Sequence, residues 1–305
     1  MKLTAQNLQK TFLQHKFTAF LIIGVLILVG GAYLAYAKFF PLPKIEEIVE
    51  EHELNFDPEG IYALVVPRRD GNAINLNVKR VSQYQNFSYL ITYSDEKGID
   101  RGAGDLNTWI PIQKNQTEFS QEILLGTCSQ GYTSGTAHCV FDKGVENGTL
   151  ELHFKNTEKI NSRLNRAKVY KLIVPWHLQK PDIALGVLIS PDSHFQYKVS
   201  DNSLDNLSIV GFSVINDLSG LPKLPNGKQV FGKVYVLNVP TAKVLSQGNI
   251  SLEEVSEPPK NAKISYYQES KNDWQMLDTK INKSKLTTTG SGAGIYTVLV
   301  DSSSK

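Results

Sequence analysis

The stretch Phe87-Ser-Tyr-Leu-Ile-Thr-Tyr93 decides the fold class of this chain. Aromatic and apolar residues occupy every second position, and Ser88, Leu90 and Thr92 stand between them, so the second face is largely polar. This period of two is typical of a strand that buries one face. The same alternation recurs over residues 74–79 and 150–155. Short alternating runs separated by turns, without long helices between them, predict an all-β fold of antiparallel sheets arranged as β-sandwiches.

The alternating runs fall into two groups, which predict two tandem domains. We expect a first β-sandwich over residues 60–175 and a second over residues 183–305. Between them, Pro175-Trp-His-Leu-Gln-Lys-Pro181 has a proline at each end, and this predicts a linker over residues 176–182. Trp274 and Tyr296 belong to the last strand-like runs, where a role in the core is expected.

Two cysteines, Cys128 and Cys139, flank a loop rich in Gly, Ser and Thr. If this part of the chain lies outside the cytoplasm, a local disulfide across the base of the loop is expected. Two unpaired thiols are the alternative. A metal site would need more ligands than these cysteines and the nearby His138 supply.

The segments around the cysteines resemble a known class of domain. Residues 122–128, 139–145 and 150–154 are similar to immunoglobulin-like modules of bacterial single-pass envelope proteins, in which a cysteine pair also closes a hairpin. The closing pattern resembles the last strands of immunoglobulin-like and ZU5-like modules; it consists of Tyr266, Tyr267, Trp274, Leu277, Thr289 and residues 294–298. The resemblance implies a fold and a place in the envelope, and it implies no activity.

Residues 17–37, FTAFLIIGVLILVGGAYLAYA, contain no charged side chain. A helix of this length spans about 30 Å, the thickness of a hydrocarbon core. Lysines precede the run, so we expect residues 1–16 in the cytoplasm and the remainder beyond the plasma membrane, outside the cell or in the periplasm. A cleaved signal peptide ending near Ala35-Tyr-Ala37 is the alternative. A type IV pilin is disfavoured because the early glutamate of a pilin helix is missing.

The segment that follows, residues 38–59, is acidic and is predicted to be a stalk. Within it, residues 45–53 place Ile45, Ile48 and Val49 on one helical face and glutamates on the other, which predicts a helix.

The charge of the chain excludes one function class. Three of its 32 basic residues lie in residues 1–37, which leaves 29 bases against 30 acids in the rest. A nearly neutral region lacks the basic surface that nucleic-acid binding needs.

No catalytic constellation is visible in the sequence, so we expect no enzyme, no cofactor and no metal ion. The candidate binding loops are residues 95–105, 128–139 and 221–227, because sandwich domains bind through loops. The residues singled out in the first two are Asp95, Asp100, Asp105, Tyr132 and His138. Calcium binding by the three acids is an alternative to a solvated hairpin.

These observations together predict a membrane-anchored surface protein. One helix would cross the bilayer through residues 17–37, and two immunoglobulin-like sandwiches would bind an envelope protein or a surface polymer. The alternatives are a subunit of a secretion or adhesion assembly and an enzyme acting on the cell wall, which a pocket with two convergent carboxylates would favour.

Overall fold

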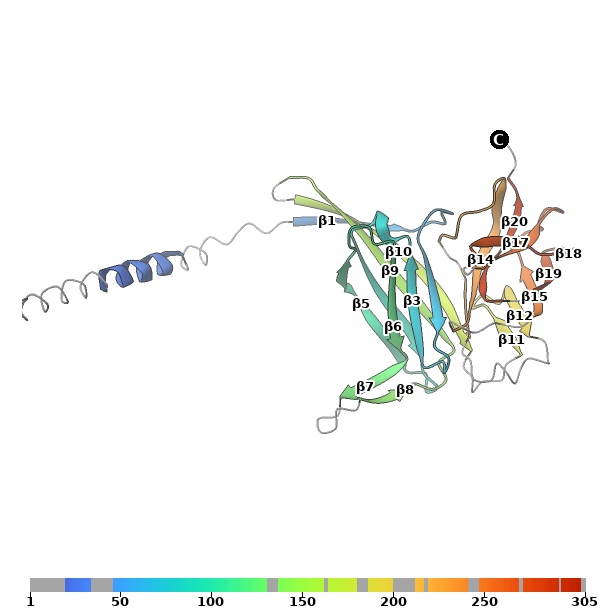
Figure 1. Ribbon diagram of the computed structural model, residues 1–305, viewed down its shortest axis with the longest axis horizontal. Coiled ribbons are helices and arrows are strands. Elements are labelled where there is room, and N and C mark those ends of the chain that lie inside the picture. Colours follow the sequence, from blue (N-terminus) through green and yellow to red (C-terminus); the bar gives the residue numbers. More distant parts are fainter. Residues whose placement is uncertain are drawn as a thin grey trace, which may run out of the picture. The chain divides into compact units, whose positions relative to one another are not determined.

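The structure is a computed structural model that describes residues 20–33, 46–130, 137–161, 164–179, 186–199, 212–216, 219–240, 247–268, 271–290 and 292–302. Strands dominate the described residues, which confirms the predicted all-β class (Figure 1). The chain divides into two compact units: residues 1–48 with 158–166, and residues 49–157 with 167–305.

The first unit contains a helix over residues 20–33 and the adjoining ends of two long strands, residues 158–159 and 164–166. The apolar side chains of the helix are exposed, and Phe20 and Leu28 are 72% and 74% exposed. In the described part of the chain, no helix is both long and apolar enough to span a bilayer. Residues 17–19 and 34–37 of the predicted span lie outside the described residues.

The strands in the described part of the chain belong to four sheets. The ten-stranded sheet has the order β17 (Asp273–Met276), β16 (Lys263–Gln268), β20 (Gly294–Asp301), β14 (Lys228–Asn238), β13 (Phe212–Asn216), β10 (Leu164–Gln179), β9 (Asn147–Lys159), β4 (Asn86–Ser94) and β5 (Asp100–Pro111), and β1 (Glu46–Glu53) also pairs with β10. The five-stranded sheet has the order β11 (Val187–Ile189), β12 (Phe195–Val199), β15 (Gly248–Glu253), β19 (Lys285–Gly290) and β18 (Lys280–Asn282). The three-stranded sheet contains β2 (Tyr62–Pro67), β3 (Ala73–Lys79) and β6 (Glu118–Leu124). The short helix η1 (Val81–Gln83) comes directly after β3 in the chain. The last sheet pairs β7 (Gly126–Gln130) with β8 (Ala137–Phe141).

The predicted linker is wrong over residues 176–179, which form the end of β10. Trp176 and Leu178 are fully buried there, and these four residues pair with β13. Pro175 directly precedes the paired residues, so its missing N–H removes no bond from that ladder. Residues 180–182 lie outside the described residues. Strands from both predicted sandwiches therefore belong to one ten-stranded sheet.

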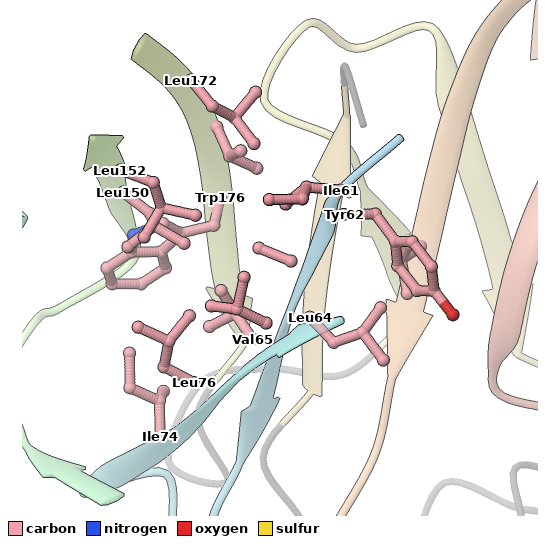
Figure 2. Packing of buried hydrophobic residues seen from close by; sticks show 14 of the residues in the cluster. Ile61, Tyr62, Leu64, Val65, Ile74, Leu76, Leu150, Leu152, Leu172 and Trp176 are labelled. Atoms are coloured by element: carbon pink, nitrogen blue, oxygen red, sulfur yellow. The ribbon is translucent and has the colours of Figure 1, made fainter. Parts of the chain in front are cut away.

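The larger apolar core lies where the three-stranded sheet packs against β9 and β10. Figure 2 shows Trp176, Leu150 and Leu152 on one side of β2 and the ring of Tyr62 on the other. Every residue of β2 except Val66 is buried, so this strand packs on both faces. The same core includes Trp274 on β17, which confirms its predicted core role.

A second core lies between the five-stranded sheet and the neighbouring part of the ten-stranded sheet. Phe195 stacks on Tyr235, with ring centroids 5.5 Å apart, and it contacts Tyr296 at 5.2 Å. Tyr296 is fully buried, as the sequence predicted. These contacts join β12 of one sheet to β14 and β20 of the other, a sandwich arrangement with an inner apolar face.

The predicted stalk helix is wrong, because residues 46–53 form strand β1. Lys171 on β10 forms an ion pair with Glu51, and His52 stacks on Tyr170 with ring centroids 5.5 Å apart. Pairing with β10 satisfies the backbone of this segment, and such tertiary pairing overrides the weak helical preference of a short acidic run. Ile45 and the earlier part of the predicted stalk lie outside the described residues.

Candidate functional site

The outer face of the five-stranded sheet contains a groove of about 640 Å³. Its walls come from four neighbouring strands and from the loop before β18, and polar side chains predominate. The lining residues are Gln196, Lys198, Asn249, Ile250, Ser251, Asp278, Lys280, Lys285, Thr287, Thr288 and Thr289. A volume of this size falls within the range of small-molecule sites in proteins.

Strand register arranges the groove side chains in rows across the sheet. One row consists of Gln196, Ser251, Thr287 and Lys280, which pair in that order from β12 to β18. The next row consists of Lys198, Asn249 and Thr289. Neighbouring strands lie about 4.8 Å apart, so four strands present a polar surface roughly 14 Å wide.

The opposite face of the same strands is apolar, which explains why these polar residues point outward. Tyr197, Ile250 and Leu286 alternate with the groove residues and are buried in the second core. Side chains of a strand alternate between its two faces, so burial of one set exposes the other.

Three lysines give the groove a positive charge. Within the described residues, Lys198, Lys280 and Lys285 have no carboxylate within ion-pair distance. The one acid in the lining, Asp278, lies 3.8 Å from the amino group of Lys263 outside the groove. The positive charge of the groove is therefore available to a ligand.

A buried acid lies behind this sheet, directly after β15. Glu254 is only 7% exposed, and its Oε1 atom has no hydrogen-bond partner among the described residues. The carboxyl occupies the space beside Gly232, where a Cβ would collide with it. Gly232 has a φ of 78° and lies where the β14–β20 pairing shifts register, so a glycine both adopts this backbone and admits the acid.

Two neighbouring carboxyls in this region have opposite pKa shifts. Burial, and to a smaller extent the charge of Asp192, raise the pKa of Glu254 to about 7, while the charge of Lys233 opposes the shift. Burial also raises the pKa of Asp192, but hydrogen bonds, foremost that from Ser190, bring it below its usual value. Ser190 Oγ donates to Asp192 at 2.6 Å, and Tyr235 donates at 3.3 Å. At neutral pH the pair therefore holds an ionised Asp192 and a Glu254 near its titration point.

The three acids predicted for a binding loop do not converge. Asp95 lies in the turn after β4, whereas Asp100 and Asp105 belong to strand β5, so the prediction of a loop over residues 95–105 is wrong beyond residue 99. Five residues of strand separate Asp100 from Asp105 by roughly 17 Å.

Each of these acids is engaged in local hydrogen bonds. Asp95 Oδ1 accepts the N–H groups of Lys97 and Ile99 at 2.9 and 3.0 Å, and the bond from Ile99 is the main cause of its lowered pKa. Asp100 accepts the hydroxyl of Ser94 at 2.9 Å. In Asp105 the N–H of Asn107 likewise lowers the pKa. These contacts stabilise a hairpin turn and a strand.

The cysteine hairpin matches the prediction of a local pair. Cys128 on β7 and Cys139 on β8 are directly opposite in the antiparallel register, and their sulfurs are at disulfide distance. The hairpin stands out from the neighbouring strands (Figure 1). Tyr132 lies outside the described residues, and His138 lies on β8 with its side chain outside the description.

The third predicted binding loop packs against the protein. Leu221 is fully buried, and the backbone carbonyl of Lys223 accepts a 3.0 Å hydrogen bond from the indole of Trp274. A pocket of about 430 Å³ adjoins the loop between Arg80 and Asp273. The loop therefore fixes the end of β17 in place, and Lys223, Asn226 and Gly227 are its exposed residues.

Comparison of the chain with known protein families and with curated proteins finds no match. The candidate site therefore depends on the geometry described above.

The sequence-based interpretation missed both the groove and the buried acid. The groove had one local signal, the polar run Lys285-Leu-Thr-Thr-Thr289 with a single buried leucine. Its partners on β12 and β15 are distant in the sequence, so the signal could indicate a polar face and could not indicate a groove.

Proposed function

We propose that this chain is a membrane-anchored, non-enzymatic surface protein that holds a β-sheet region beyond the plasma membrane to bind an envelope partner. The N-terminus would remain in the cytoplasm, and residues after the helix would be extracellular or periplasmic. The immunoglobulin-like and ZU5-like resemblance is part of this proposal as the family of the β-region.

One observation carries the proposal: the helix over residues 20–33 is uncharged, and its large apolar side chains are exposed. The exposed set includes Phe20, Leu21, Ile22, Ile23, Val25, Leu26, Ile27, Leu28 and Val29. Soluble proteins rarely expose so large an apolar surface, whereas a lipid-facing helix requires it. The predicted span continues on both sides of this helix to a total of 21 residues.

Two further features support the exported position of the β-region. A cysteine pair at disulfide distance is typical of oxidising compartments. Three lysines (Lys2, Lys10 and Lys16) precede the apolar run and two (Lys38 and Lys44) closely follow it, and this excess favours a cytoplasmic N-terminus.

The test is membrane retention of a charged variant. Leu26→Lys puts a charge in the middle of the apolar run, which costs about 3 kcal/mol in a membrane-spanning helix. We expect the unmodified chain to stay in the membrane pellet after alkaline extraction and the variant to be depleted from it. Val255→Lys is the matched control, because Val255 is an 87% exposed apolar residue in the β-region. Equal retention of L26K and V255K, or complete extraction of the unmodified chain, would contradict the anchor.

A further inference from the structure

We propose that the groove on the five-stranded sheet binds an anionic polysaccharide, a glycan chain that carries carboxylate or phosphate groups. This inference rests on the proposed surface location, because such polymers occur outside the plasma membrane. It goes further in naming the binding face and the chemistry of the partner.

The charge of the groove favours an anion. Lys198 lies on β12, and Lys280 and Lys285 lie toward the opposite edge of the sheet on β18 and β19. About two to three strand spacings separate Lys198 from the other pair, or roughly 10–14 Å. Positive charges at two ends of one groove suit an extended ligand with repeated negative charges better than a single small anion.

Carboxylates near the groove leave this positive charge largely intact. Asp278 lies beside Lys263, as described above. Glu253 is exposed at the end of the central strand β15, pairs in register with Lys285 and lies outside the groove lining. The groove lining itself therefore contains three cations and one acid.

Between the lysines, the groove offers hydrogen-bonding groups that match sugar hydroxyls. Ser251, Thr287 and Thr289 have hydroxyls that both donate and accept, and Gln196 and Asn249 add amides of both kinds. Sugar hydroxyls also donate and accept, so a glycan can pair with each of these groups in either sense, whereas ionised acidic side chains only accept.

The groove lacks the features of a protein interface. Its one large apolar lining residue, Ile250, is 1% exposed because its side chain belongs to the second core. Protein interfaces depend on buried aromatic or aliphatic anchors at their centre, and the described lining presents no such anchor. The polar and cationic chemistry therefore favours a charged glycan over a protein partner.

The experiment measures binding of defined polymers to the full chain purified in detergent. The probes are polygalacturonate, which carries carboxylates, dextran phosphate, which carries phosphates, unmodified dextran and polyglutamate. We expect one of the two charged glycans to bind, with an affinity that falls as sodium chloride rises from about 0.05 M to about 0.5 M, because salt screens exposed charges. The glycan that binds more tightly shows whether the groove prefers carboxylate or phosphate groups. Dextran and polyglutamate are expected to bind at least several-fold more weakly.

Matched variants locate the binding. Replacing Lys198, Lys280 and Lys285 together by Gln should lower the affinity for the charged glycan about tenfold, since each exposed ion contact contributes a factor of roughly two. The control replaces three exposed lysines elsewhere, Lys97, Lys114 and Lys260, by Gln and so removes the same net charge. It should change affinity less than twofold.

A second variant tests the hydrogen bonds to sugar hydroxyls separately from the attraction between charges. Thr287→Val with Thr289→Val keeps the lysines and removes two hydroxyls, and it should weaken glycan binding while leaving any residual polyglutamate binding unchanged. Thermal unfolding of each variant checks that the fold is retained.

Three outcomes would overturn the proposal: no charged glycan binds, polyglutamate binds as tightly as the glycans, or the control lysine set weakens binding as much as the groove set. Failure of the membrane anchor is a separate result, because it is measured by alkaline extraction while polymer binding is measured in detergent.

Discussion

Replacing Glu254 by Gln should make the stability of this protein less dependent on pH. The carboxyl is buried without a partner for Oε1, and burial, together with the charge of Asp192, raises its pKa from 4.5 to about 7. Below pH 4.5 the group is protonated in both the folded and the unfolded chain. Between the two pKa values the unfolded chain releases its proton while the folded chain keeps it, so the free energy of unfolding falls as the pH rises.

The size of this loss follows from the shift. Each pKa unit corresponds to about 1.36 kcal/mol, so the shift of Glu254 corresponds to about 3 kcal/mol, complete once the pH exceeds about 7. Glutamine cannot ionise and keeps nearly the same shape. The E254Q variant should therefore equal the unmodified chain in stability near pH 4.5 and exceed it by about 3 kcal/mol at pH 8.

The assay is urea unfolding of the full chain in detergent at several pH values between about 4.5 and 8. The difference between variant and unmodified chain is the quantity of interest, because the contributions of other titrating groups cancel in it. Glu253→Gln is the matched control, since Glu253 precedes Glu254 in the chain and is exposed. A difference for E254Q that stays constant with pH, or one that shrinks as the pH rises, would refute the reasoning.

Two further predictions concern the fold. Replacing Cys128 and Cys139 by Ser should destabilise the β7–β8 hairpin by about 3 kcal/mol, because this two-stranded sheet pairs with no other described strand and such hairpins are marginal alone. Limited proteolysis should then cleave within residues 126–141 much faster, and an unchanged cleavage rate would contradict a stabilising disulfide. Gly148→Ala should lower the free energy of unfolding by about 2 kcal/mol, because a Cβ there collides with the ring of Trp176 on β10 and with the backbone carbonyl of Thr92 on β4. In a double-mutant cycle with Trp176→Leu, part of this loss should be recovered, and strictly additive effects would contradict the described packing.

The sequence predicted well those strands in which apolar and polar residues alternate along the strand itself. Residues 87–93 alternate apart from Leu90, and Phe87, Ile91 and Tyr93 are buried on β4, although Ser88 on the other face is buried as well. The cysteine pair was also predictable, because the chain has two cysteines and they lie only 11 residues apart.

Errors arose where pairing with a distant strand decided the local structure. The glutamates of residues 46–53 fit a helix, but β10 lies more than a hundred residues away in the chain and recruits this segment as a strand. Pro175 and Pro181 suggested a linker, yet Trp176 and Leu178 have the burial of core residues. A proline at the end of a ladder has the same sequence signature as a proline in a linker.

The candidate site was least predictable for the same reason. The groove requires β12, β15, β19 and β18 to be neighbours, and this order differs from their order in the sequence. Glu254 has no local signal at all, since its burial depends on the space above Gly232 in β14.

The most direct test of the central claim is protease treatment of intact cells that express the chain with different epitopes at its two ends, after removal of any outer membrane or wall. The account predicts that the C-terminal epitope is removed while the N-terminal epitope stays protected in the membrane fraction. Protection of the C-terminal epitope in intact cells, with cleavage only after the membrane is dissolved, would contradict it.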